Sequence, residues 1–410
     1  MTEPEGELSV GRHAPLRELP RRVWQYLAAL SPWRVALLVT MVYGALVLGP
    51  VVQGRAGDFA FVGHRYLDRS GTSAAIADHA RATSRDGYDG QFALFIALDP
   101  AHAAPSIDKP AYRYSHILYP VLSRALALGH NSWVPVAMLL VNLLAVFSGT
   151  LALALILKRS HEPPALAAAF GLFPGMFVAF ERDLGDVLAY SLVPVAVLAM
   201  RWDRSSRLVL AGLLFAAAGL ARESTLFFPA VLGLWHVIQP GRRPRRALQA
   251  AVLAVLAATP YVGWRLFLLS WIGPSHSVPS GLASFPFQGI LFQRSAFEVL
   301  VVVLPGLLLA FAALGGLRGR RTSPFVLVVL VQVLVFVIFL PQASYADYNA
   351  AGRLQLGTVL AALCCVPALR GLADRFRKSL RAAIALAMLP VLLFTIAVLS
   401  AIAVLLGGAV

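Results

Sequence analysis

The chain contains 410 residues, of which 59% are hydrophobic and 13% are charged. In soluble domains about a quarter of all residues are charged. The mean hydropathy of this chain is +0.73. These values exclude a disordered chain, a small disulfide scaffold and an ordinary soluble enzyme. The net charge of +15 could indicate a nucleic-acid partner, so its meaning depends on where the basic residues lie.

Long apolar blocks follow a polar N-terminal segment, residues 1–34, which is too long for a usual cleaved signal peptide. Many blocks approach the roughly 20 residues that cross a bilayer. We therefore predict an all-α polytopic membrane protein with a single transmembrane domain over residues 35–410. About eleven spans are expected, at 35–53, 133–157, 164–180, 184–200, 207–221, 224–239, 247–269, 297–316, 324–341, 354–369 and 382–407.

The basic residues orient these spans. With the N-terminus in the cytoplasm, segment 1–34 and the five short loops on the same side hold 22 of the 35 Lys and Arg residues but 7 of the 20 Asp and Glu residues. The rest of the chain holds 13 of each kind. Cytoplasmic loops typically carry this bias. The positive charge is therefore interpreted as a topology signal with contacts to membrane lipids, and not as nucleic-acid binding.

Two longer segments fall on the extracytoplasmic side, a first loop at 54–132 and a second loop at 270–296. The first loop contains apolar stretches, and we predict short interfacial helices at 91–98 and 115–129. A long loop that folds is usually functional. This loop is rich in aspartates, namely Asp58, Asp68, Asp78, Asp86, Asp89, Asp99 and Asp108.

The segment DGYDGQ, residues 86–91, places two carboxylates among glycines directly before an apolar helix. Glycines permit unusual backbone angles and the close approach of a substrate. Asp89 is a candidate catalytic residue, and Asp86 and Gln91 are candidate substrate-binding residues. The alternative for Asp89 is an N-cap, because it lies where the helix should begin.

A second motif, YRYSH at 112–116, combines a guanidinium with aromatic rings. Arg113 offers a planar fork that suits phosphate, and the tyrosines suit a membrane interface or stacking on a sugar face. Arg113, Tyr114 and His116 are candidate substrate-binding residues. The alternative is an aromatic belt at the membrane interface with a snorkelling arginine.

Three span junctions carry further ionisable residues, and such residues near a membrane are functional candidates. Asp183 and Asp186 could bind a polar ligand, or could belong to a solvated turn. Arg222 and Glu223 could bind substrate, or could pair with each other. Arg353 could reach an anionic headgroup. The adjacent Cys364 and Cys365 lie in an apolar block and are interpreted as core residues.

The first loop resembles membrane glycosyltransferases of the GT-C class, particularly the GPI-anchor mannosyltransferase II type and its bacterial relatives. The resemblance covers about residues 54–130, and Tyr88 stands where that pattern usually has Trp. The residues that carry it are Tyr88-Asp89, Phe92, Ile96-Ala97, Leu118-Tyr119-Pro120 and Arg124.

The resemblance implies an extracytoplasmic active site in the first loop and a polyprenyl-phosphate-linked sugar as the donor substrate, with inversion at the anomeric carbon. It points to Asp89 as the general base, and Asp58 is the second choice. No cofactor is required by these motifs, although the density of Asp and His permits a divalent metal. The sugar, mannose or another, stays open.

We therefore expect an integral glycosyltransferase of a bacterial plasma membrane whose acceptor is a glycan, a glycolipid or a protein. One alternative is a transporter or flippase of lipid-linked saccharides. That function would need ionisable residues deep in the spans, and most charges here lie at span ends. Another alternative is a non-catalytic partner in envelope assembly.

Overall fold

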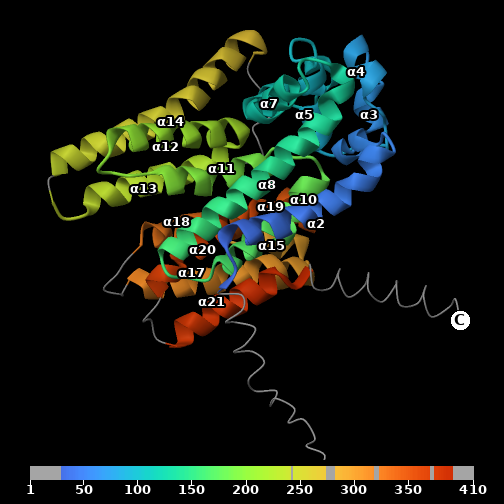
Figure 1. The fold of residues 1–410 in the computed structure, drawn as a ribbon. Coiled ribbons are helices and arrows are strands. Elements are labelled where there is room, and N and C mark those ends of the chain that lie inside the picture. The colour runs from blue at the N-terminus through green and yellow to red at the C-terminus, as the bar shows by residue number, and fades with distance from the viewer. Residues whose placement is uncertain (1–28, 242, 274–281, 318–322, 370–373, 391–410) are drawn as a thin grey trace, which may run out of the picture.

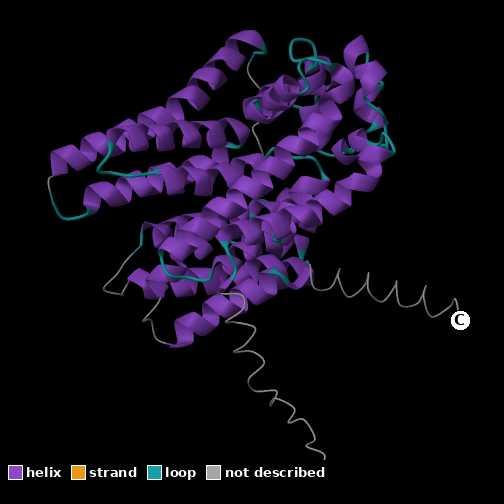
Figure 2. Cartoon of the chain, in the orientation of Figure 1, coloured by secondary structure: helices purple, strands orange, loops and turns teal. Residues whose placement is uncertain are grey.

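The computed structural model describes residues 29–241, 243–273, 282–317, 323–369 and 374–390. Within these ranges the chain is all-helical, as predicted (Figure 2). The one β-type pairing among them is an isolated parallel bridge between Gly63 and Ser84. The apolar segments therefore satisfy their backbone hydrogen bonds within helices, which is what a membrane interior demands.

Five helical segments are long and apolar enough to cross a membrane, and a bent pair, Pro164–Gly171 with Pro174–Glu181, is a sixth candidate. Four shorter apolar segments lie where further spans are predicted: Asp186–Ala199, Ser205–Ala221, Glu223–Ile238 and Pro324–Ile338. These helices are consistent with a multi-pass membrane protein. Most of the last predicted span, 382–407, lies outside the described residues. The five long segments are Pro32–Val52, Asn131–Arg159, Arg243–Trp271, Ala296–Leu317 and Tyr348–Ala368.

The N-terminal half packs as a continuous series of helices (Figure 1). Helix α2 begins after Ser31, whose side chain caps the Arg34 N–H, and packs on α8. Helix α11 packs between α8 and α12, and α14 covers α12 and α13. The bounds are α2 (Pro32–Val52), α8 (Val134–Arg159), η5 (Pro164–Ala167), α9 (Ala168–Gly171), α10 (Pro174–Glu181), α11 (Asp186–Ala199), α12 (Ser205–Ala221), η6 (Glu223–Leu226), α13 (Phe227–Ile238) and α14 (Arg243–Trp271).

The C-terminal half joins the series where α19 packs on α10 and where α18 packs on α13. Helix α20 lies inside this half, and it buries both cysteines, as expected for core residues. The bounds are α15 (Gln288–Gln293), α16 (Ala296–Glu298), η7 (Val299–Val303), α17 (Leu304–Leu317), α18 (Pro324–Val333), η8 (Leu334–Ile338), η9 (Gln342–Tyr345), α19 (Tyr348–Leu354), α20 (Leu356–Cys365), η10 (Val366–Leu369) and α21 (Asp374–Ala387).

One predicted boundary differs. The connection between the predicted spans 324–341 and 354–369 is largely helical, because η9 and α19 occupy it. Asp347 is the N-cap of α19, and its side chain accepts a hydrogen bond of 2.9 Å from the Ala350 N–H. An N-cap of this kind satisfies an amide that the helix leaves unpaired, so the helix begins before the apolar block does.

The first loop folds into short helices at one end of the bundle, in the upper right of Figure 1. Helix α5 begins one residue before the predicted range 91–98 and ends with it, and α7 lies within the predicted range 115–129. The bounds are η1 (Ala56–Ala60), α3 (His64–Leu67), α4 (Ala74–His79), α5 (Gly90–Leu98), η2 (Ala104–Ser106), α6 (Pro110–Arg113), η3 (Tyr114–His116), α7 (Leu118–Leu126) and η4 (Asn131–Trp133).

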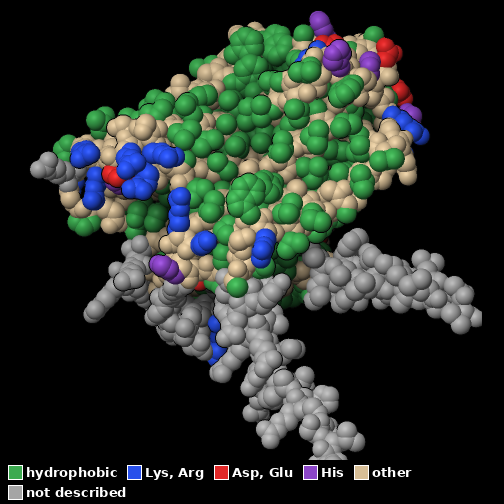
Figure 3. Space-filling model, in the orientation of Figure 1, with side chains coloured by type: hydrophobic (Ala, Val, Ile, Leu, Met, Phe, Trp, Pro, Cys, Tyr) green, Lys and Arg blue, Asp and Glu red, His purple; other side chains and the backbone are tan. Residues whose placement is uncertain are grey.

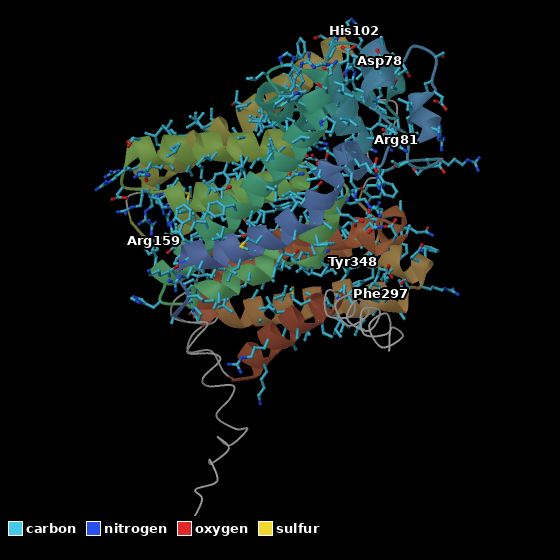
Figure 4. All side chains as sticks on the ribbon, turned by 45° about the vertical axis from the view of Figure 1, so that its right-hand side comes forward. Asp78, Arg81, His102, Arg159, Phe297 and Tyr348 are labelled. Carbon is cyan, nitrogen blue, oxygen red and sulfur yellow. The ribbon has the colours of Figure 1, made fainter. Side chains whose placement is uncertain are left out.

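Charges separate between the two ends of the molecule. On the face shown in Figure 3, Lys and Arg side chains gather at the left, Asp and His side chains gather at the upper right, and apolar side chains cover the surface between them. In Figure 4, Asp78 and His102 mark the end formed by the first loop, and Arg159 lies at the far side. The apolar band with charged ends is the surface expected of a membrane protein.

Candidate functional site

A cavity of about 50 Å³ lies where the first loop meets the ends of the spans. Its wall combines three arginines with two aspartates and a histidine, all of which come from different parts of the chain. Six of the twelve site residues predicted from sequence line it. The lining residues are Asp89, Phe92, Ala93, Arg113, His116, Tyr119, Pro120, Leu184, Gly185, Asp186, Ala221, Arg222 and Arg353.

Asp89 occupies the N-cap position of α5, but its side chain makes no capping hydrogen bond. Its two carboxylate oxygens lie instead 2.8 Å from Arg113 Nη2 and 2.7 Å from Arg353 Nη2. Burial alone would raise the pKa of this carboxyl, but the guanidinium groups of Arg353 and Arg113 hold it well below its usual value. Asp89 therefore stands at the N-cap position, as the alternative predicted, but its side chain joins the first loop to α19 and does not cap α5.

Two glycines allow this junction to close. A Cβ on Gly90 would lie 2.0 Å from the Arg182 carbonyl oxygen, so only glycine lets α5 start against the α10–α11 connection. A Cβ on Gly175 would lie 2.2 Å from the Gly352 carbonyl oxygen. That close approach of α10 and α19 brings the neighbouring Arg353 to the cavity.

Arg113 is held from three sides. Its Nε and Nη2 atoms donate to the two carboxylate oxygens of Asp108 at 2.9 and 3.0 Å, a bidentate pair. Its guanidinium carbon lies 4.6 Å from the centre of the Phe92 ring, a favourable cation–π distance. Arg113 is thus a fixed, partly buried cation, and the snorkelling alternative does not hold.

Asp186 and Arg222 face each other more loosely. Arg222 Nε lies 3.6 Å from Asp186 Oδ1, and Arg353 Nη1 lies 4.0 Å from Asp186 Oδ2. Both Arg222 Nε and Asp186 Oδ1 are buried and have no hydrogen-bond partner in the described part of the chain. Unpaired buried polar atoms are costly, and a polar ligand in the cavity would satisfy them.

Glu223 does not pair with Arg222, as the alternative for that junction required. Its carboxylate accepts a hydrogen bond from Nε2 of His116 in the first loop. The Tyr112 ring packs against the imidazole in a T-shaped arrangement at a centroid distance of 5.0 Å. The first loop is therefore attached to the α12–α13 junction at the cavity.

Asp183 lies behind the cavity wall and is 1% exposed, so a solvated turn is excluded. Its carboxylate accepts hydrogen bonds from the Tyr119 hydroxyl and from Asn142 Nδ2, the latter at 3.3 Å. Burial raises the pKa of Asp183 to about 7, although both hydrogen bonds act to lower it. This network fixes the α10–α11 connection and, with it, Asp186.

Besides Asp183 and Glu223, four predicted site residues lie away from the cavity wall. Asp58 pairs with Arg55 at 2.8 Å on η1. Gln91 is buried, and its Oε1 accepts from the Gly63 N–H, so it supports the loop. The Tyr114 hydroxyl donates to the Pro100 carbonyl. The fourth residue, Asp86, is exposed and lies 3.5 Å from Arg65.

The described residues contain no group of three or more His, Cys, Asp or Glu side chains that could hold a metal ion. Both oxygens of Asp89 already face guanidinium groups. These side chains do not fit a divalent metal, whose ligands must converge on one point. The cavity wall offers instead an anion-binding surface, with three guanidiniums against two carboxylates.

Comparison of the chain with protein-family models, with curated proteins and with solved structures gives no match. The site therefore has to be interpreted from its own chemistry. Sequence reasoning missed Asn142 and the role of Asp108. A polar residue within an apolar span signals Asn142, whereas nothing in the spacing of Asp108 distinguishes it from the other aspartates of the loop.

Proposed function

We propose that the protein is an integral membrane glycosyltransferase with a GT-C-like arrangement. It would move a sugar, mannose or another, from a polyprenyl-phosphate donor to an extracytoplasmic glycan, glycolipid or protein acceptor. The observation that carries this proposal is the convergence of Arg113, Arg222 and Arg353 on one cavity. The resemblance of the first loop supports the reaction class.

Glycosyl transfer from a lipid phosphate places negative charge on the leaving group. Preorganised cations aimed at that charge are usually the largest contribution to such a reaction. Arginine is suited to phosphate because it presents several donors in a planar fork. Arg222 supports this role best, because its buried Nε is unpaired and its nearest carboxylate oxygen is 3.6 Å away.

The proposal includes eleven spans with the N-terminus in the cytoplasm of a bacterial plasma membrane. The basic loops then lie on the cytoplasmic face, as the positive-inside bias demands, and the cavity opens toward the other face. A donor with a lipid tail could reach it from the bilayer, because the lining residues lie at the ends of spans.

Asp89 belongs to the reacting centre in this proposal. The resemblance assigns it the role of general base, and its place between two cations supports a part in the reaction. Asp58 is less suited, because it pairs with Arg55 and does not line the cavity. Neither assignment needs a metal.

The test uses the full chain in lipid nanodiscs with synthetic polyprenyl-phosphate mannose, then other polyprenyl-phosphate sugars, and bacterial membrane extract as acceptor. Transfer is measured as label in the acceptor and as released polyprenyl phosphate. We expect Asp89→Asn to abolish transfer and Arg222→Gln to raise the donor KM about tenfold or more, since a hydrogen bond to a charged group contributes about 1.5–3 kcal/mol. The exposed residues of α4 and its flank provide the matched controls Asp78→Asn and Arg81→Gln.

Three results would overturn the proposal. Absence of transfer by the wild-type protein with every sugar tested would refute the proposal. Transfer that survives Asp89→Asn at normal protein levels removes the site assignment. Movement of an intact lipid-linked saccharide across a vesicle membrane, without release of polyprenyl phosphate, would establish the flippase alternative instead.

A further inference from the structure

The cavity wall holds two different kinds of ionisable group. The aspartates and arginines form one ion-pair cluster, in which Asp89, Arg113, Arg353, Asp186 and Arg222 are linked by contacts of 2.7 to 4.0 Å. His116 stands outside that cluster. Its described hydrogen-bond partner is the Glu223 carboxylate, and its side chain lines the same cavity.

Asp89 is poorly prepared to accept a proton. Each of its carboxylate oxygens faces a guanidinium, at 2.8 Å for Arg113 and at 2.7 Å for Arg353. A base is effective when its affinity for a proton is matched to the working pH, and two adjacent cations weaken that affinity. The geometry suits a carboxylate that sets the position of two cations.

His116 has the opposite surroundings. When Nε2–H donates to the Glu223 carboxylate, the lone pair resides on Nδ1, the other ring nitrogen. No hydrogen bond to Nδ1 is formed by the described residues. The Tyr112 ring packs against the imidazole in a T-shaped arrangement, with ring centroids 5.0 Å apart, and restrains its orientation. The His116 side chain is 15% exposed and that of Glu223 is 36% exposed, so the pair is open to a ligand.

We infer that His116 is the catalytic residue that accepts the proton of the acceptor hydroxyl, and that Glu223 is its positioning residue. The inference rests on the proposed glycosyl transfer and changes the role of Asp89 within it. Asp89 then holds Arg113 and Arg353 in place for the donor phosphate. The acceptor binds on the His116 side of the cavity, and the donor phosphate binds on the arginine side.

The acceptor hydroxyl gives its proton to Nδ1 of His116, and its oxygen forms a bond to the anomeric carbon of the donor sugar. The bond between that carbon and the phosphate oxygen breaks, and the electron pair leaves with polyprenyl phosphate. The Glu223 carboxylate stabilises the imidazolium that results, and the arginines stabilise the leaving phosphate.

The experiment compares His116→Ala, Glu223→Gln and Asp89→Asn in the nanodisc transfer assay, with and without added imidazole. The control is His79→Ala, because His79 is exposed at the end of α4. We expect His116→Ala to lower kcat by about 10²- to 10⁴-fold, the usual contribution of a general base. The donor KM should be unchanged.

Free imidazole should restore part of the His116→Ala activity, and a series of substituted imidazoles should restore it in the order of their basicity. It should restore nothing in Asp89→Asn, which should stay inactive because Arg113 and Arg353 lose the carboxylate that positions them. Glu223→Gln should lower kcat with the donor KM unchanged.

A His116→Ala variant that transfers at the wild-type rate would overturn the inference while leaving the proposed function in place. A variant that loses activity, folds normally and is not rescued by any imidazole would show a structural role and would also overturn it. Absence of transfer in the wild type would instead be a failure of the proposed function, so the two failures are distinguishable.

Discussion

The close approach of α10 and α19 gives a sharp test of how the site is assembled. Gly175→Ala adds a Cβ that would lie 2.2 Å from the Gly352 carbonyl oxygen and 2.7 Å from a Phe173 ring carbon. Ordinary contacts begin near 3.4 Å, so the two helices must separate by about 1.2 Å. Overpacking of this kind costs about 1–3 kcal/mol.

The separation should also reach the cavity. Arg353 follows Gly352 directly, and its 2.7 Å contact with Asp89 cannot survive a displacement of that size without a new rotamer. We therefore expect Gly175→Ala to weaken the Arg353–Asp89 pair as well as the fold. In a double-mutant cycle with Arg353→Gln, the two substitutions should be non-additive in their effect on the free energy of unfolding.

Thermal unfolding of the purified protein in detergent measures the loss of stability caused by Gly175→Ala. Gly263→Ala is the matched control, because Gly263 lies in α14 and a Cβ there would have no neighbour within 4 Å. Alanine is the better helix former by up to about 1 kcal/mol, so the control should be neutral or stabilising. Equal melting temperatures for the two variants would refute the reasoning, and so would strict additivity in the cycle.

Three further predictions concern the supports of the site. The raised pKa of Asp183, about 7 in the folded protein against 3.8 in a free side chain, means that the folded state binds more protons between these values. Stability should therefore fall as pH rises from about 4 to 7. Asp183→Asn should make the melting temperature less dependent on pH over this range, and an unchanged pH dependence would contradict the burial argument. Tyr119→Phe removes a buried donor to Asp183 and should cost about 1–3 kcal/mol in the free energy of unfolding, whereas a neutral result would mean that the network is replaceable. Asp347→Ala should cost about 1 kcal/mol by loss of the α19 cap and Asp347→Asn much less, and equal losses in the two variants would argue against capping.

Several features follow from the sequence because they depend on local composition. An apolar block must become a helix in a bilayer, since no other single segment satisfies its own backbone there. The all-helical fold and the two short helices α5 and α7 are confirmed in the described residues on this ground. Helix α19 starts earlier than the apolar block predicts, because the Asp347 cap acts outside that block.

The candidate residues were also largely identifiable, because ionisable side chains at span junctions stand out against apolar surroundings. The interaction partners of these residues could not be identified from the sequence. The pairs Asp89–Arg353 and His116–Glu223 join positions 264 and 107 residues apart, and local patterns do not encode such distances. Asp89 resembled a helix cap, and Arg222 and Glu223 resembled a pair, until the other side chains around them were placed.

The sequence alone predicts that this chain is helical and that several of its segments are apolar enough to span a membrane, and its Lys and Arg pattern predicts which ends of the helices share a side. Only the tertiary structure decided which charges meet. Glycines at 90 and 175 let backbones approach to distances that no other residue permits, and these contacts bring α5 and α19 together at the cavity. The strength of an ion pair depends on separation and burial, so the chemistry of each candidate residue was decided by packing between segments that are remote in the chain.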